Sequence, residues 1–369
     1  MLVKGRRVYR GHRAASTRAP AIILFVVVLL LLVFLLSFSL LPQYLVYYRD
    51  GVNMVVPMLQ DSGEGYKLTA ATPPQPYPGI VSADYQVSQP DYSTLDFGAG
   101  AGLHYLQGYF VPYNKVSESG LETAVKEAQR SSVKGLVLEM KDENGKLAWL
   151  SGVAAAASYG VNGSWDPSAE LAELKAQGWF LAAELSCAVD TSLATGFPEL
   201  ALKDMTGKPY TDGAGSWVDP WSRDVRSYIS QLCEDLISLG FDEIILTHVE
   251  HPLAEVGYTR KIGSSLDRTA CTMNFAISVR QSIEPSMKKS GVRLSAELSR
   301  DTLTNTAANG QSLENMLKVF DRVVLPTTTY SEDAKIFVEN HIDSTVRFVP
   351  QMSWCFSGGS WILDPSITD

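Results

Sequence analysis

The chain divides into stretches of different hydrophobic and polar patterning. Residues 21–41 carry no charge and are mostly Leu, Val, Ile and Phe. Residues 42–101 have no sustained period and are rich in Tyr, Pro, Gly, Ser and Asp, a composition typical of a spacer or stalk. In residues 102–369, short β-rich runs alternate with amphipathic stretches, which indicates βα units around a parallel sheet.

The last stretch contains eight β-rich runs. They lie at 105–111, 135–140, 179–185, 243–248, 293–298, 322–325, 347–351 and 360–363. Helical periodicity appears between them, at 121–130, 168–177, 223–239, 264–289, 313–320 and 332–340. Eight strands within about 260 residues predict an α/β (β/α)8 TIM-like barrel. An open doubly wound sheet is the alternative, because a strand count does not establish closure.

The uncharged run at 21–41 has the length of a transmembrane helix, for which roughly 20 apolar residues suffice. Six Lys and Arg residues and no acid precede it in a basic tail, 1–20, and such an excess favours a cytoplasmic N-terminus. A cleaved signal peptide is the competing interpretation, but its apolar core usually spans about 7 to 15 residues. We therefore expect a single-pass signal-anchor in the cell membrane, which contacts the lipid bilayer and holds the barrel outside the cytoplasm.

Charge and cysteine spacing narrow the classes of partner. The formal net charge is −9, and leaving out the six N-terminal positive charges gives −15 for the rest of the chain. A domain this acidic repels nucleic acid, so we expect no nucleic-acid partner. The four cysteines lie far apart, without the spacing of a metal site, and no cofactor motif is present.

Four glutamates occupy the ends of the second to fifth predicted strands, where a barrel of this class carries its active site. They are Glu139, Glu184, Glu250 and Glu297. Hydrolysis of a glycosidic bond needs two carboxyl groups, one protonated and one ionised. Each glutamate taken alone is also consistent with a buried ion pair to Lys or Arg.

Flat aromatic rings and polar side chains near the same ends are candidates for contacts with a sugar. The candidate substrate-binding residues are Tyr113, Asp142, Trp149, Trp217, Asp219, His248, Gln351 and Trp354. Asp219 precedes a proline and a predicted helix, so an N-cap is an alternative role. His248 and His251 flank Glu250, but the pair lacks an obvious third ligand, and we expect no metal site.

Several spaced motifs carry a family resemblance. Residues 197–204 (FPELALKD), 207–209 (GKP), 217–220 (WVDP) and 240–244 (GFDEI) resemble the bacterial putative glycosyl hydrolase family with a TIM-barrel fold. Residues 136–145 look like its second strand and loop, and 347–351 and 360–364 look like its seventh and eighth strands. The resemblance covers about residues 103–364, and it implies a carbohydrate, either a polysaccharide or a cell-wall glycan, as the partner.

The chain departs from that family after its fourth strand. The family typically continues there with an aromatic residue and Asp-Tyr-Val-Arg-Phe-Pro, and the resemblance implies that this Asp is the catalytic acid. Here Thr247 takes its place, Glu250 replaces the Arg, and His251 replaces the Phe. Glu184 likewise stands where the family commonly shows another Arg. A threonine hydroxyl cannot serve as a carboxylate.

Three hypotheses follow for the function. In the first, catalysis has moved to other acids, with Glu297 as the best candidate acid and Glu184 or Glu139 as its partner. In the second, the barrel is inactive and serves as a carbohydrate-binding or envelope scaffold protein. In the third, the 42–101 stalk holds partner proteins.

Overall fold

A computed structural model describes residues 92–204, 206–253, 256, 268–303, 308–340 and 344–367, together with the backbone of two short strands nearer the N-terminus. The chain forms two compact units, residues 1–76 and 77–369. In the first unit, β1 (Leu45–Tyr48) and β2 (Gly51–Met54) pair in antiparallel fashion. The predicted anchor at 21–41 lies outside the described residues. None of the helices in the described part of the chain has the length and apolarity needed to cross a bilayer.

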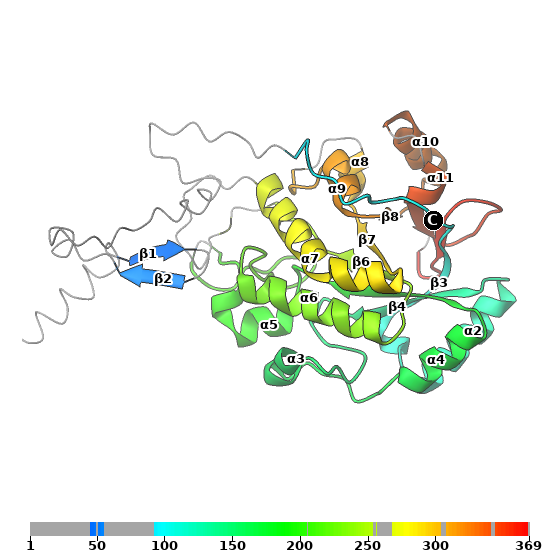
Figure 1. The fold of residues 1–369 in the computed structure, drawn as a ribbon, viewed down its shortest axis with the longest axis horizontal. Helices are drawn as coiled ribbons and strands as arrows, with labels where there is room; N and C mark the ends of the chain where they lie inside the picture. Colours follow the sequence, from blue (N-terminus) through cyan, green and yellow to red (C-terminus); the bar gives the residue numbers. More distant parts are fainter. Residues whose placement is uncertain are drawn as a thin grey trace, which may run out of the picture. The chain divides into compact units, whose positions relative to one another are not determined.

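The second unit is a closed barrel of eight parallel strands (Figure 1). They are β3 (Gln107–Val111), β4 (Gly135–Lys141), β5 (Phe180–Ser186), β6 (Glu243–Thr247), β7 (Arg293–Glu297), β8 (Arg322–Pro326), β9 (Phe348–Met352) and β10 (Trp361–Leu363). Each strand pairs with the next along the chain, and β10 pairs with β3 to close the ring. All eight predicted strands are confirmed, and closure excludes the open doubly wound sheet.

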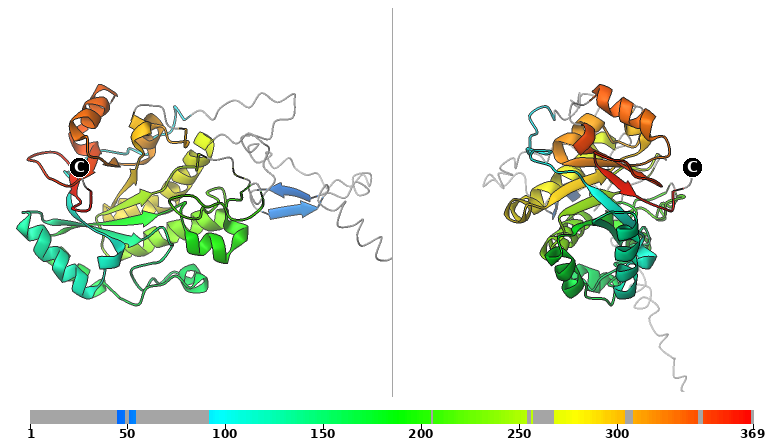
Figure 2. Two further views of the ribbon diagram at one scale, coloured as in Figure 1. Left: turned by 180° about the vertical axis from the view of Figure 1, so that it is seen from behind. Right: turned by 90° about the vertical axis from the view of Figure 1, so that its right-hand side faces the viewer.

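Helices cover the outside of the barrel (Figure 2). They are α2 (Glu118–Arg130), α3 (Ala154–Tyr159), α4 (Ser168–Ala176), α5 (Thr191–Gly196), α6 (Arg223–Ser238), α7 (Arg268–Ser290), α8 (Arg300–Leu303), α9 (Leu313–Val319), α10 (Tyr330–Asn340) and α11 (Ser344–Arg347). The six predicted helices correspond to α2, α4, α6, α7, α9 and α10. The other four have only four to six residues, which is too short to show a helical period in the sequence.

Along each strand, side chains point alternately into the barrel and away from it. A small apolar cluster fills its middle, with a residue from nearly every strand: Leu106, Phe110, Val137, Ala182, Ile245, Val324, Val349 and Ile362. Residues two positions further along a strand point inward as well, nearer its C-terminal end. These inward positions hold Glu139, Glu184, Thr247, Gln351 and, just after β10, Asp364. Glu297 joins them because it pairs in register with the inward Val324.

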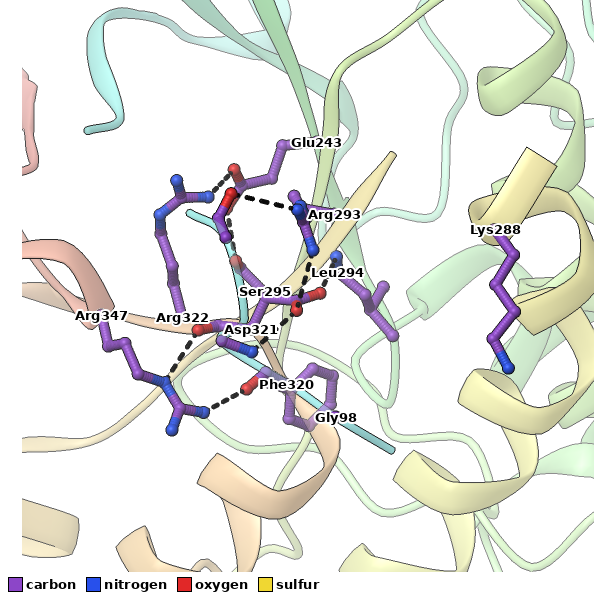
Figure 3. A network of polar contacts seen from close by, with 12 residues as sticks. Gly98, Glu243, Lys288, Arg293, Leu294, Ser295, Phe320, Asp321, Arg322 and Arg347 are labelled. Carbon is purple, nitrogen blue, oxygen red and sulfur yellow. Dashed lines mark hydrogen bonds and ion pairs between the residues drawn. The ribbon is translucent and has the colours of Figure 1, made fainter. Parts of the chain in front are cut away.

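The N-terminal end of the barrel is closed by a buried network of ion pairs (Figure 3). Glu243 at the start of β6 forms an ion pair with Arg322 at the start of β8 and accepts a hydrogen bond from Ser295 Oγ. Beside this pair, Asp321 accepts a 3.0 Å bond from Arg280 Nη1. These charged side chains are almost completely buried, and each has a partner of opposite charge.

Residues 92–101 contact this same end of the barrel. The Gly100 N–H donates to Asp321 Oδ1 at 3.0 Å, and the Arg280 guanidinium lies 5.6 Å from the Phe97 ring centroid. The sequence assigns these residues to the 42–101 spacer. The structure therefore shows that Tyr92, Leu95, Phe97 and Gly100, near the end of the predicted spacer, pack against the barrel.

Candidate active site at the C-terminal strand ends

Glu139 and Glu184 lie next to each other at the C-terminal ends of β4 and β5. They are partners in the register of these parallel strands, so their Cα atoms are about 4.8 Å apart and their side chains share a face. Glu139 Oε2 accepts a 2.7 Å hydrogen bond from the Tyr113 N–H. Glu184 is 8% exposed, and its Oε2 has no hydrogen-bond partner among the described residues. A buried acceptor without a partner is costly to stability.

Glu250 and Glu297 are joined by a residue that the sequence did not single out. Gln311 Nε2 donates to Glu250 Oε2 at 3.3 Å and to the Glu297 carbonyl oxygen at 3.4 Å. Gln311 is itself held by Thr302, whose hydroxyl donates to Gln311 Oε1 at 2.7 Å. Because Gln311 precedes α9 rather than ending a strand, its position in the sequence does not reveal this role.

The four candidate acids share a raised pKa, and burial is the main cause for each. Burial raises the pKa of Glu139 to about 7, against the Tyr113 hydrogen bond that lowers it. It likewise raises the pKa of Glu250 to about 7. Burial and the charge of Glu250 raise the pKa of Glu297 to about 8. Burial and the charge of Glu297 raise the pKa of Glu184 well above its ordinary value. Burial therefore favours the protonated form of these carboxyl groups.

An uncharged group ends β6, at the position where the resemblance implies an aspartate. Thr247 points inward at the end of β6, and its Oγ1 lies 3.3 Å from His248 Nδ1. Ser186 Oγ lies 3.1 Å from the same nitrogen. Burial lowers the pKa of His248, which favours the neutral imidazole. The described part of the chain contains no group of three or more His, Cys, Asp or Glu side chains that could hold a metal ion.

Gln351 and Asp364 complete the inward layer from β9 and the end of β10. Gln351 Nε2 donates to Asp364 Oδ2 at 2.9 Å. Gln351 is 5% exposed, and its Oε1 has no hydrogen-bond partner among the described residues. The sequence proposed Gln351 as a sugar contact but missed Asp364, whose proximity depends on closure of the barrel between β10 and its neighbours.

Two aspartates predicted to contact a sugar instead accept hydrogen bonds from residues of their own loops. Asp142 Oδ1 accepts a 2.8 Å bond from the Lys146 N–H, and its Oδ2 accepts from Asn144 Nδ2 at 2.9 Å. Asp219 Oδ1 accepts from the Trp221 N–H at 2.8 Å. The N-cap of α6 is Ser222, so the alternative role of Asp219 as the N-cap is wrong. Both aspartates shape loops at the C-terminal end of the barrel.

The structure places the predicted tryptophans in different environments. Trp149 is 1% exposed and donates from Nε1 to Asp235 Oδ2 on α6 at 2.9 Å. As part of the hydrophobic core, it presents no face to a sugar, which corrects that prediction. Trp217 is 3% exposed and packs edge-on against the His248 ring, with 6.4 Å between centroids. It therefore supports His248 rather than offering an open ring.

Trp354 and Tyr113 do lie at the C-terminal strand ends. Tyr113 follows β3 and contacts Glu139 through its backbone. Trp354 follows β9 and is 44% exposed. Its ring centroid lies 5.8 Å from that of Tyr330 and 5.9 Å from that of Phe356. The rings of Trp354, Tyr330 and Phe356, which we call the aromatic platform, offer apolar faces of the kind that stack on sugar rings. The sequence missed Tyr330 and Phe356.

Three solved structures are similar to this chain, and the one with a TM-score above 0.5 agrees with the barrel fold. The glycoside hydrolase domain of PgaB (BpsB) from Bordetella bronchiseptica is 13% identical, with a TM-score of 0.51 over 67% of this chain and 84% of that one. A hypothetical protein from Ruminiclostridium thermocellum is 24% identical, with a TM-score of 0.44 over 51% of this chain and 96% of that one. A cycloalternan-degrading enzyme from Trueperella pyogenes is 11% identical, with a TM-score of 0.44 over 70% of this chain and 42% of that one. The comparison with curated protein sequences found no match.

A family profile decides the assignment. The profile described as "putative glycosyl hydrolase domain" matches residues 108–330, which is more than half of the chain. The match runs from β3 to the first residue of α10 and includes the four candidate glutamates. The chain belongs to this glycosyl hydrolase domain family.

Proposed function

We propose that this barrel hydrolyses glycosidic bonds of a polysaccharide, using glutamates at the C-terminal ends of its strands. The observation that carries the proposal is the inward layer of carboxyl groups on β4, β5 and β7, none of which forms an ion pair with a described residue. Carboxyl groups at the strand ends of such a barrel are where catalysis is expected. Their raised pKa values suit acid–base chemistry near neutral pH.

Glu297 is the proposed general acid. Its pKa of about 8 keeps it protonated at pH 7, so its proton is available to the glycosidic oxygen of the leaving sugar. Nearby acids favour this state, because ionising Glu297 beside Glu250 and Glu139 places like charges together.

Glu139 is the proposed ionised partner. It is the glutamate in the layer that accepts a backbone N–H bond, from Tyr113, and this bond favours its carboxylate form. The carboxylate either attacks the anomeric carbon or takes a proton from the attacking water. The pKa values of about 7 for Glu139 and about 8 for Glu297 predict a narrow activity optimum between pH 7 and 8. Activity falls below that window as Glu139 gains a proton, and above it as Glu297 loses one.

The test incubates the full chain, held in a mild detergent because of its apolar 21–41 segment, with neutral, acidic and amino-containing polysaccharides. Release of reducing ends and binding are both scored. Wild type and Glu122→Gln, a control at an exposed position on α2, are expected to release sugar. Glu297→Gln is expected to lose at least ~100-fold of the rate. Binding without release would instead support the inactive carbohydrate-binding barrel.

Thr247→Asp distinguishes the hydrolase from the inactive carbohydrate-binding barrel directly, because it introduces the carboxylate that the family resemblance implies at this position. If catalysis has moved to other acids, a further inward carboxylate raises the pKa of its neighbours, and the rate does not increase. A variant that gains hydrolysis where the wild type has none would show that the natural chain is inactive at this position.

We further propose that residues 21–41 anchor the protein in the cell membrane with the barrel outside the cytoplasm. The support is the uncharged run of 21 residues and the six preceding positive charges. In intact cells, added protease is expected to digest residues 42–369 and to leave the basic tail protected. A barrel that stays protected until the cells are lysed would contradict this orientation.

A further inference from the structure

Two acceptor atoms in the inward layer lack a donor. Glu184 Oε2 and Gln351 Oε1 have no hydrogen-bond partner among the described residues, although both side chains are more than nine-tenths buried. The orientation of the Gln351 amide is fixed because its Nε2 donates to Asp364 Oδ2 at 2.9 Å. Its carbonyl oxygen is therefore the atom left unsatisfied. A ligand that satisfies Gln351 and the ionised form of Glu184 must bring hydrogen-bond donors.

The same layer also holds several acidic side chains that no cation among the described residues balances. Glu139, Glu143, Glu297 and Asp364 all act on Glu184 as like charges, and Glu250 acts on Glu297 in the same way. Lys141 is the cation at the end of β4. Its Nζ lies 2.9 Å from Asp190 Oδ2 and donates to the Ser186 carbonyl at 2.7 Å. Lys141 is thus already neutralised.

His248 adds no positive charge, because burial lowers its pKa. The carboxyl groups consequently meet their desolvation cost by holding protons. A cationic ligand would remove that cost and let them ionise.

We propose that the substrate is a polysaccharide bearing free, protonated amino groups, and that Glu184 and Gln351 bind the ammonium group of one sugar unit. An ammonium group has three donors and no acceptor, which matches two unmet acceptors in an acidic layer. An N-acetyl group carries no charge, brings a single N–H and adds a carbonyl oxygen that finds no cationic donor there. This inference rests on the proposed function only in that it takes a sugar to be the ligand.

The first test compares ligands that differ at one substituent. The full chain is titrated at pH 6.5 with β-1,4 hexamers of glucosamine, N-acetylglucosamine and glucose. Galactosamine and its N-acetyl and hydroxyl counterparts are compared by ligand-detected NMR, so that the result does not depend on one linkage. The amino sugars are expected to bind at least ~10-fold more tightly, with affinity falling as salt rises. Equal or tighter binding of the N-acetyl or hydroxyl forms would overturn the inference.

The second test measures protons. Ammonium binding lowers the pKa of neighbouring carboxyl groups, so protons are released on binding at pH 7, as measured by calorimetry in buffers of different ionisation enthalpy. Glu184→Gln keeps the shape of the side chain and removes its charge. It is expected to reduce proton release and to abolish the preference for the amino form, whereas Glu122→Gln changes neither. A preference that survives in Glu184→Gln would contradict the assignment of that residue.

The outcomes separate this inference from the proposed function. Hydrolysis of a neutral polymer without preference for amino sugars would overturn the inference and uphold glycosidase activity. Tight binding of amino sugars without release of reducing ends would uphold the inference and overturn glycosidase activity.

Discussion

Buried glutamates have opposite surroundings at the two ends of the barrel interior. At the N-terminal end, Glu243 is completely buried and is held by Arg322 and Ser295. At the C-terminal end, Glu184 is almost as buried, yet its Oε2 has no partner among the described residues and its neighbours are other acids. Burial raises the pKa of both residues, but Arg322 opposes the shift at Glu243 whereas Glu297 adds to it at Glu184.

This difference distinguishes Glu243, a structural carboxylate, from Glu184, a proposed functional one. Glu243 stabilises the fold because its charge is compensated within the chain. Glu184 reduces stability, and such a residue is retained where a ligand or a reaction needs it. The position along the strand therefore decides the role, in line with the division of these barrels into a stability end and a functional end.

The largest expected effect is at the N-terminal end. Arg322→Met leaves Glu243 buried without its counter-charge, and the free energy of unfolding is expected to fall by about 3–5 kcal/mol. Chemical denaturation of the full chain measures this change. Arg130→Met, which removes an Arg whose side chain is 72% exposed, is the control and should change the free energy by less than about 0.5 kcal/mol. A loss below about 1 kcal/mol in Arg322→Met would mean that the buried network at this end contributes little to stability.

The second-largest effect is expected at the C-terminal end, where a substitution should lower activity and leave stability intact. Glu139→Gln removes the proposed ionised carboxylate, and turnover is expected to fall by about 100- to 1000-fold, equivalent to about 3–4 kcal/mol in the barrier. The unfolding free energy should stay the same or rise, because a buried acid is replaced by a neutral group. Initial rates and denaturation curves on the same preparation test both parts. Loss of folding together with loss of rate would place Glu139 with the structural acids.

A smaller effect is expected in the pH dependence of stability. Glu297 has an ordinary pKa of 4.5 and a folded-state pKa of about 8. Its contribution to stability is therefore fully present below pH 4.5 and is lost as pH rises to about 8. Glu297→Gln should match the wild type below pH 4.5, and its advantage should grow by about 3 kcal/mol between pH 5 and pH 8.

Comparison of the two proteins at each pH isolates this carboxyl group. The lowered pKa values of His248 and His251 oppose the trend, but they contribute equally to both proteins. A constant difference between pH 5 and pH 8 would show that the Glu297 pKa is not raised.

The smallest effect concerns the aromatic platform. Trp354→Ala removes a partly exposed ring from contact with Tyr330 and Phe356. Affinity for an oligosaccharide, measured by titration of the intact protein, is expected to fall by about 5-fold, or about 1 kcal/mol, with little change in the free energy of unfolding. Trp149→Phe provides the contrasting buried case, which should lower stability without changing affinity. An unchanged affinity in Trp354→Ala would remove the platform from the site.

The eight strands and six longer helices could be predicted because each has a local pattern long enough to recognise. The ends of the strands could be predicted as well, and with them the candidates Glu139, Glu184 and Glu297. The residues Gln311, Asp364, Tyr330 and Phe356 could not be found in this way, because no local pattern marks them. Trp149 was assigned to the wrong environment because a tryptophan after a strand has the same sequence pattern whether it faces a sugar or Asp235.

The sequence by itself determined the alternation of strands and helices and the acidic character of the chain. Hydrophobic periodicity is local, so it is written in neighbouring residues. Only the tertiary structure decided which buried acids have partners. Glu243 and Arg322 are 79 positions apart, and Gln351 reaches Asp364 only where β9 and β10 pair. Closure of the barrel sets these contacts and so separates the stabilising end from the end left free for chemistry.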